Sequence, residues 1–360
     1  MKPLAVVIAG GGTGGHLYPG IAVARELLRR LPDTQVTFAG TARGIESRVV
    51  PKEGFALDVL RSAGLKGMSP DALARGLGLL PLSGVDAWRI VAARRPDVVI
   101  GVGGYSSGPV VLAAAVRGIP TMLLEQNAVP GLTNRLLGRV VRAAAVTFEP
   151  TLRFFGGRGF VSGNPVRPEF LDAAAAAARG DRTRVLIFGG SQGAHAINVA
   201  MVAAAPRLAA AGGGLDIVHQ TGARDLELVR EGYRSAGLEA RTEPFLYEMA
   251  REMSGADMVV CRAGATTIAE LTAAGKPAVL IPLPTAADDH QRRNADVLER
   301  AGAAELVDQK DLAGGVLADR LLALAADPAR RAAMGRAART FARPDAARVI
   351  VDRALELAGR

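Results

Sequence analysis

The residues between Asp257 and Asn294 combine groups that could hold both a phosphate and a sugar. An apolar run ends in a glycine-containing turn, and a helical pattern with Thr266 in its first turn follows. The first turn of such a helix presents free backbone N–H groups, which bind anions. One turn later, the Glu270 carboxylate can accept hydrogen bonds from sugar hydroxyls but would repel a bare phosphate. The stretch therefore indicates a nucleotide site, although a helix cap and a turn alone would give the same pattern.

A second glycine-rich loop lies near the N-terminus. An apolar strand expected at residues 4–9 enters the segment 10–16, which reads Gly-Gly-Gly-Thr-Gly-Gly-His, and Pro19 is expected to open the next helix. The glycines match a dinucleotide fingerprint, but that fingerprint also needs an acidic residue at the end of the second strand. Here that strand ends in Gly40 and Thr41. A nicotinamide or flavin is therefore disfavoured, and no cofactor is predicted.

Strand-like and helix-like segments alternate along the whole chain. The strands expected in the first half are residues 4–9, 35–39, 55–60, 98–102, 121–125 and 143–148. The pattern restarts near residue 162, and the strands expected after it are 185–188, 216–220, 241–245, 258–261 and 278–281. Repeated βα units with apolar strands predict parallel sheets that bind ligands at their carboxyl edges. The predicted fold class is α/β, with two doubly wound, Rossmann-like domains.

The charge balance favours anionic partners. The chain has 44 basic and 35 acidic residues, giving a net charge of +9. Only 4% of the residues are aromatic and the basic residues are dispersed, so a nucleic-acid partner is not expected. The single cysteine, Cys261, precludes an internal disulfide and favours the cytoplasm.

A segment before residue 98 mixes apolar and basic residues around Trp88, the only tryptophan of the chain. Its other apolar members are Leu65, Met68, Leu73, Leu77, Leu79, Leu80, Leu82 and Val85. Its basic members are Lys66, Arg75, Arg89, Arg94 and Arg95. One interpretation is a loop and a helix packed on the sheet. The other is a basic-rimmed apolar patch that lies on an anionic membrane surface.

Six sequence blocks, taken together and in this order, resemble those of the MurG family. They are residues 10–20, 103–109, 125–134, 163–167, 189–193 and 261–271. This bacterial family adds N-acetylglucosamine to the lipid-linked muramyl-pentapeptide precursor of peptidoglycan. The resemblance implies the glycosyltransferase B fold, in which two domains face each other across a cleft. It also implies a peripheral enzyme at the cytoplasmic face of the cell inner membrane.

The resemblance assigns the two domains different substrates. Residues 1–163 would form the acceptor and membrane-side domain, and residues 164–342 would bind the UDP-sugar. The final helix, about 343–360, would pack back on the first domain.

The resemblance also implies which residues surround the substrates. Near the first glycine loop and the transferred sugar these are Thr13, Gly14, Gly15 and Asn127. On the nucleotide side they are Arg167, Ser191, Leu246, Ala265, Thr266, Thr267, Ile268, Ala269, Glu270, Gln291 and Asn294.

Several of these residues would have separate tasks. Arg167 and Ser191 would hold the diphosphate, and Leu246 would offer backbone atoms to the uracil. Glu270 would bind the ribose. Gln291, together with Asn294, would bind the sugar hydroxyls. His290 stands where some relatives carry a second glutamine, so its contact with the sugar stays open.

Sugar transfer from a nucleotide diphosphate needs a stabiliser for the departing phosphate and a base for the attacking hydroxyl. The sequence has no Asp-x-Asp or other metal-binding motif, so we expect fixed dipoles and cations rather than a metal. No motif suggests a covalent nucleophile, which predicts a single displacement with inversion. His16 is the first candidate base because its intrinsic pKa is about 6.5, and Glu125 is the second. His195 and His219 are expected to be structural.

The predicted reaction transfers N-acetylglucosamine from UDP-N-acetylglucosamine to the C4 hydroxyl of the muramyl sugar of lipid I, giving lipid II. A non-hydrolysing UDP-N-acetylglucosamine 2-epimerase stays as an alternative, because it shares the fold and the nucleotide. It would, however, need several carboxylates in the cleft and has no use for the apolar patch. A non-catalytic basic binding protein would not need glycine loops in both halves.

Overall fold

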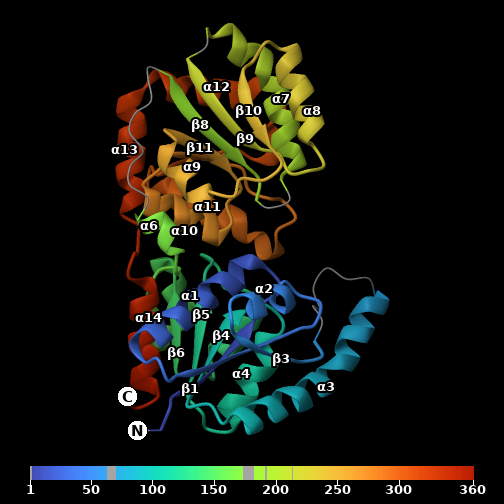
Figure 1. The fold of residues 1–360 in the computed structure, drawn as a ribbon, viewed down its shortest axis with the longest axis vertical. Helices are drawn as coiled ribbons and strands as arrows, with labels where there is room; N and C mark the ends of the chain where they lie inside the picture. The colour runs from blue at the N-terminus through green and yellow to red at the C-terminus, as the bar shows by residue number, and fades with distance from the viewer. Residues whose placement is uncertain (1, 63–69, 173–181, 191–192, 213) are drawn as a thin grey trace. The chain divides into compact units, whose positions relative to one another are not determined.

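The computed structural model describes residues 2–62, 70–172, 182–190, 193–212 and 214–360. The chain forms two compact units, each an α/β layer structure (Figure 1). The first comprises Met1–Val166 with Arg343–Arg360, and the second comprises Arg167–Ala342. The boundary lies within the turn-rich segment 163–167.

The first unit contains a seven-stranded sheet in the order β3-β2-β1-β4-β5-β6-β7, and every strand pair in it is parallel. The strands are β1 (Ala5–Gly10), β2 (Gln35–Gly40), β3 (Ala56–Val59), β4 (Val98–Gly103), β5 (Thr121–Glu125), β6 (Ala143–Val146) and β7 (Gly159–Val161). The expectation that residues 143–148 close this set is wrong, because β7 extends the sheet. Strand β7 has three half-buried residues, which is too short for a hydrophobic pattern to reveal.

Helices cover both faces of this sheet. They are α1 (Gly14–Arg30), α2 (Glu46–Lys52), α3 (Pro70–Arg94), α4 (Ser107–Val116), α5 (Leu132–Leu137) and α14 (Ala346–Leu357). The side chains of β1 alternate between two cores, with Val6 and Ile8 in one and Val7 in the other. Helix α14 lies beside α1 (Figure 1), where Asp352 pairs with Arg30 at 2.6 Å.

Helix α1 begins earlier than its sequence suggests. We expected Pro19 to open it, but the helix starts at Gly14, and the buried Pro19 lies inside it. The carbonyl of Thr13 accepts hydrogen bonds from the amides of His16 and Leu17, which fixes Thr13 as the N-cap. The glycine loop therefore leads directly into the first helical turn.

The second unit contains a six-stranded parallel sheet in the order β10-β9-β8-β11-β12-β13. Its strands are β8 (Thr183–Phe188), β9 (Leu215–Gln220), β10 (Ala240–Glu243), β11 (Met258–Cys261), β12 (Ala278–Leu280) and β13 (Ala304–Leu306). The last strand, again of three residues, was not expected. The sequence-based fold class, two doubly wound parallel α/β sheets, is confirmed.

The helices of the second unit follow its strands in the alternating order that the sequence predicts. They are α6 (Pro168–Asp172), α7 (His195–Ala210), α8 (Leu226–Ser235), α9 (Met249–Gly255), α10 (Ala265–Ala274), α11 (His290–Arg300), α12 (Val316–Ala326) and α13 (Pro328–Arg339). Helix α7 starts at His195, directly after its N-cap Ala194.

Candidate functional site

Three loops of the first unit meet at the carboxyl edge of its sheet, after β1, β4 and β5. The Nδ1 atom of His16 lies 3.2 Å from Oε1 of Gln126, and Nε2 of Gln126 donates to the carbonyl of Val102 at 3.0 Å. The amide of Gly11 donates to the carbonyl of Gly103 at 3.3 Å. This edge therefore gathers His16 and the segment around Asn127, as the parallel topology predicts.

Glycines allow this close approach. A Cβ atom on Gly103, where φ is +100°, would lie 2.7 Å from Nδ1 of His16. A Cβ atom on Gly104 would lie 2.5 Å from the carbonyl oxygen of Gly11. Any side chain at these positions would displace either the histidine ring or the first glycine loop.

Glu46, at the start of α2, is a residue of this edge that sequence reasoning missed. It is buried, and its Oε2 accepts from the amide of Gly12 at 2.8 Å. Its Oε1 accepts from the amide and the hydroxyl of Thr41, at 2.9 and 2.8 Å. Burial alone would raise the pKa of Glu46, but these hydrogen bonds hold it below its ordinary value. Glu46 therefore anchors the first glycine loop to the end of β2.

Glu125, the second candidate base, is enclosed by hydrogen-bond donors. Its Oε1 accepts from the amide and the side chain of Asn127, at 3.0 and 3.2 Å. Its Oε2 accepts from Nδ2 of Asn134 at 2.8 Å and from the amide of Gly131 at 3.3 Å. Only 3% of Glu125 is exposed, and this burial raises its pKa. These contacts favour a role in shaping the loop after β5 and in holding Asn127.

In the second unit, the first turn of α10 has the features of an anion site. Its N-cap is Gly264, without a side-chain cap, so the simple alternative that Thr266 caps the helix does not hold. The hydroxyl of Thr266 is buried and makes no hydrogen bond with the described residues. A buried hydroxyl without a partner is costly unless a ligand or water satisfies it.

Arg167 and Glu270, expected at the diphosphate and at the ribose, are paired with each other. The Nη2 and Nε atoms of Arg167 lie 2.9 and 3.3 Å from Oε1 of Glu270. The guanidinium also stacks 4.7 Å from the ring centroid of Phe170. Burial raises the pKa of Glu270, and Arg167 opposes that shift. This ion pair fixes the Glu270 carboxylate, which lies one helical turn after Thr266 in α10.

Three other expected residues tie together loops at the carboxyl edge of the second sheet. The amide of Leu246 donates to Oε1 of Gln220 at 2.8 Å. Oε1 of Gln291 accepts from the amide of Leu283 at 3.0 Å. Asn294 is fully buried, and its Nδ2 donates to the carbonyl of Ala263 at 3.3 Å. Burial places Asn294 beneath the surface that a sugar would reach.

Four of the remaining expected residues of the second unit lie in α10, at the same edge. Ala265, Ile268 and Ala269 are buried in α10, with Thr267 half-buried beside them, and Ser191 lies outside the described residues.

Two histidines of the second unit belong to polar contacts within the protein. His219 is buried, with Nδ1 2.7 Å from the Tyr233 hydroxyl and Nε2 3.0 Å from Oδ1 of Asn198. Burial lowers the pKa of His219 to about 3, so it is neutral. The Nδ1 atom of His195 lies 2.9 Å from Oδ2 of Asp225. His219 is thus structural, as the sequence suggests.

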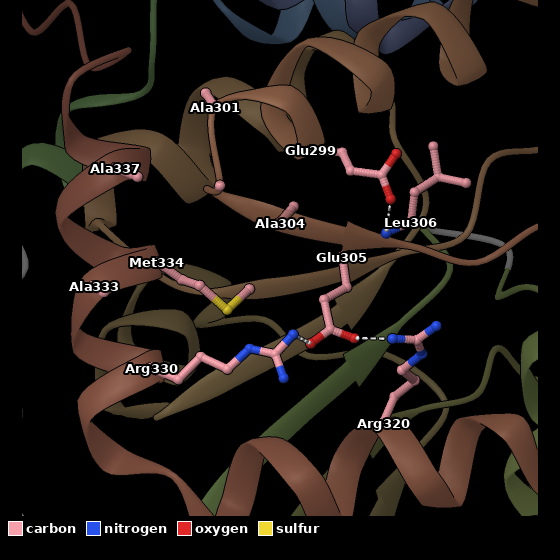
Figure 2. A pocket seen from close by; sticks show the side chains of 11 residues that line it. Glu299, Ala301, Ala304, Glu305, Leu306, Arg320, Arg330, Ala333, Met334 and Ala337 are labelled. Carbon is pink, nitrogen blue, oxygen red and sulfur yellow. Dashed lines mark hydrogen bonds and ion pairs between the residues drawn. The ribbon is translucent and has the colours of Figure 1, made fainter.

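A cavity of about 590 Å³ lies at β13, an edge strand of the second sheet, beside α12 and α13 (Figure 2). Three of its charged residues pair with one another, since Glu305 contacts Arg320 at 3.3 Å and Arg330 at 2.7 Å. The Glu299 carboxylate accepts from the amide of Leu306 at 3.2 Å. None of the residues expected at the nucleotide lines this cavity, so it is not the candidate site.

Two kinds of feature are absent from the part of the chain that the structure describes. No three or more His, Cys, Asp or Glu side chains come together there as metal ligands could. In the same ranges, no helix has the length and hydropathy needed to span a membrane.

Comparison with known proteins assigns both halves of the chain to one family. Residues 6–146 match the glycosyltransferase family 28 N-terminal domain, and residues 184–350 match the family 28 C-terminal domain. The UDP-N-acetylglucosamine–N-acetylmuramyl-(pentapeptide) pyrophosphoryl-undecaprenol N-acetylglucosamine transferase of Anaeromyxobacter sp. strain K is 48% identical. That alignment covers 99% of this chain and 94% of the relative.

Solved structures support the same family assignment. The crystal structure of Acinetobacter baumannii MurG is 32% identical, with a TM-score of 0.82, and the match covers 98% of this chain and all of that one. A UDP-N-acetylglucosamine 2-epimerase aligns with a TM-score of 0.67 at 16% identity, covering 100% of this chain and 97% of the other. At that identity the epimerase shares the fold alone.

Proposed function

The chain belongs to glycosyltransferase family 28 and, within it, to the MurG family, and from that membership we propose its reaction and the roles of its residues. The protein transfers N-acetylglucosamine from UDP-N-acetylglucosamine to the C4 hydroxyl of the muramyl sugar of lipid I. The product is lipid II, the disaccharide precursor of peptidoglycan.

The observation that carries the donor site is the first turn of α10. There the buried hydroxyl of Thr266, which has no hydrogen-bond partner among the described residues, lies at a helix N-terminus, one turn from the Glu270 carboxylate. Backbone N–H groups and a hydroxyl suit the diphosphate. The carboxylate suits the ribose hydroxyls, and Arg167, which pairs with Glu270, can turn its remaining donors to the diphosphate.

The other members of the donor set have narrower tasks. Leu246 and Gln291 serve the uracil and the sugar hydroxyls, with Asn294 supporting them from beneath. Ser191 is proposed as a further diphosphate ligand. Thr13, Gly14, Gly15 and Asn127 of the first unit line the side where the acceptor and the transferred sugar meet.

His16 is proposed as the general base. Nε2 of Gln126 is already committed to the Val102 carbonyl, so its Oε1 faces Nδ1 of His16 and accepts from it. This arrangement selects the tautomer with hydrogen on Nδ1 and the lone pair on Nε2. Nε2 can then take the proton of the acceptor hydroxyl.

The chemical step is a single displacement. As the acceptor oxygen bonds to the anomeric carbon, the bond from that carbon to the phosphate oxygen breaks, and UDP leaves with both electrons. The configuration is inverted. The proposed metal-free stabilisation of the leaving UDP comes from the α10 N-terminus and Arg167, which are fixed before the reaction begins.

We also place the enzyme at the anionic cytoplasmic face of the inner membrane. Helix α3 buries Ala87, Ile90 and Val91 against the sheet and leaves Trp88 46% exposed. Helices α3 and α4 pack together, and Arg117 stacks 4.8 Å from the ring centroid of Trp88. We call their exposed apolar residues, together with Arg117, the α3–α4 surface: Leu80, Leu82, Val85, Trp88, Leu112, Val116 and Arg117. Leu65, Lys66 and Met68 lie outside the described residues. The buried face of α3 is thus the packed helix of the first interpretation, and we propose its exposed face as the membrane-binding patch of the second.

Release of UDP from UDP-N-acetylglucosamine, followed with and without a short-chain lipid I analogue, tests the proposal. We expect release only when both substrates are present. Release without acceptor, or formation of the manno epimer, would favour the epimerase instead.

A further inference from the structure

The side chain of Gln220 joins two segments of the second unit that the proposed function places around the nucleotide. Gln220 ends β9 and is 2% exposed. Its Nε2 donates to the carbonyl of Gly190 at 2.9 Å, and its Oε1 accepts from the amide of Leu246 at 2.8 Å. One planar amide therefore connects the glycine loop after β8 with the residue assigned to the uracil.

The glycine side of this connection is tightly packed. Gly190 has a φ of +97°, and its carbonyl also accepts from the amide of Gly193 at 3.0 Å. A Cβ atom on Gly193 would lie 2.0 Å from the carbonyl oxygen of Thr221, the residue after Gln220. Gly190 and Gly193 thus both contact the end of β9.

The uracil side depends on the same strand end. Leu246 is buried, whereas its neighbours Phe245 and Tyr247 are exposed. Because the Leu246 amide donates to Oε1 of Gln220, the end of β9 fixes how deeply the turn between β10 and α9 is buried. An amide offers one donor and one acceptor at a single branch point, whereas neither an ionised glutamate nor a methionine can make both contacts.

We propose that Gln220 is a positioning residue for the donor nucleotide. It sets the separation between the diphosphate loop and the uracil contact before the donor arrives, without touching the donor itself. A preorganised site loses less conformational entropy when it binds. This inference rests on the proposed function, because the two segments matter together only for a nucleoside diphosphate.

The first test is the variant Gln220→Met, which has similar length and lacks both hydrogen bonds. We expect its KM for UDP-N-acetylglucosamine to rise by about tenfold or more, because the donor must then order a site that is no longer preorganised. The KM for the lipid I analogue and kcat at saturating donor should stay within about threefold of the wild type. An unchanged donor KM would overturn the proposal.

The matched control is Tyr233→Phe. It removes another buried hydrogen bond of the same unit, the one between the Tyr233 hydroxyl and Nδ1 of His219. It should lower Tm without changing the donor KM. If both variants raised the donor KM equally, general loosening of the unit would explain the effect and the positioning role would be refuted.

The variant Gln220→Glu separates positioning from packing. Its carboxylate can accept from Leu246 but repels the Gly190 carbonyl, whereas its protonated form can serve both partners. Burial beside a carbonyl raises the pKa of such a carboxyl. As the pH is lowered from about 8 to about 5, the ratio of the Kd of Gln220→Glu for UDP to that of the wild type should therefore decrease. The same ratio for Gln220→Met should stay flat, and a flat ratio for both would contradict the proposal.

Assays of the wild type separate a failure of the proposed function from a failure of the positioning role of Gln220. A wild type that neither binds UDP nor turns over UDP-N-acetylglucosamine would refute the proposed function, and the positioning role with it. An active wild type with an unaltered donor KM in Gln220→Met would refute only the positioning role.

Discussion

The guanidinium of Arg167 contacts Glu270 through a single carboxylate oxygen, Oε1, with Nη2 at 2.9 Å and Nε at 3.3 Å. None of the described residues makes a hydrogen bond to Oε2. One oxygen is thus neutralised and the other can accept from a ribose. The proposed donor site therefore has both its cation and a carboxylate oxygen for the ribose within one unit.

Replacing this carboxylate should weaken donor binding selectively. In Glu270→Gln, we expect the KM for UDP-N-acetylglucosamine to rise by about 10- to 100-fold, because a hydrogen bond to a charged group contributes about 1.5–3 kcal/mol. Initial rates at varied donor concentration measure this. Glu252→Gln is the control, since Glu252 pairs with Arg184 at 2.7 Å in the same unit. Equal donor KM values in the two variants would argue against the ribose assignment.

His16 should govern the pH dependence of the reaction. We expect His16→Gln to lower kcat by about 10²- to 10⁴-fold, as loss of a general base does. The acidic limb of its profile of kcat/KM against pH should disappear.

A comparison variant, Gln126→Met, removes the partner of Nδ1 while keeping the imidazole. That limb should then be displaced along the pH axis, not lost. An acidic limb that persists unchanged in His16→Gln would exclude His16 as the base.

His219 should make the protein less stable in mild acid. Its folded-state pKa is about 3, whereas the unfolded value is about 6.5. The unfolded chain therefore binds a proton that the folded state excludes, and stability falls as pH drops below about 6.5. Between about pH 7 and pH 5 this group should cost the wild type about 2 kcal/mol of unfolding free energy.

Urea unfolding of the wild type and of His219→Gln at both pH values measures this cost. The stability advantage of the wild type should shrink in acid by about that amount. Tyr233→Phe, which keeps the imidazole, should retain the acid sensitivity. The same pH dependence in the wild type and His219→Gln would be inconsistent with a buried neutral histidine.

The α3–α4 surface should bind anionic membranes. Trp88 is the only tryptophan, so its emission reports on this surface alone. We expect a blue shift with vesicles that contain anionic lipid and little change with neutral vesicles. Val116→Glu should weaken vesicle binding by about tenfold or more, because a charge enters the apolar contact. Leu228→Glu, at a 46% exposed leucine of the other unit, should not.

An emission spectrum that stays the same with both kinds of vesicle would remove the α3–α4 surface as the membrane contact. Equal loss of vesicle binding in the two glutamate variants would have the same meaning.

Much of the fold could be predicted because buried parallel strands are continuous apolar runs. The strand at Thr121–Glu125, for example, has the bounds that the sequence suggests. The three-residue strands β7 and β13 escaped because neither forms a continuous apolar run of four or more residues, whereas the equally short β12 lies in the apolar run 278–281. The start of α1 was misplaced because proline favours the first turn of a helix, whereas here Gly14 and Gly15 occupy that turn.

The loops of the site could be predicted, but not the residues that hold them. The resemblance to the MurG family, confirmed by the relatives, follows from residues that are close together in sequence. Glu46 and Gln220 act on partners that are distant in sequence. Glu46 lies 34 residues from Gly12, and Gln220 lies 30 residues from Gly190. Only folding brings these pairs together, so no local motif marks them.

The most direct test follows labelled N-acetylglucosamine from the UDP-sugar to a lipid I analogue in the presence of EDTA. We predict one UDP released for each label transferred, and a β-linked disaccharide by NMR of the product. Transfer that needed an added divalent metal, or an α-linked product, would contradict the inverting, metal-free mechanism. UDP formed without labelled acceptor would contradict the transferase itself.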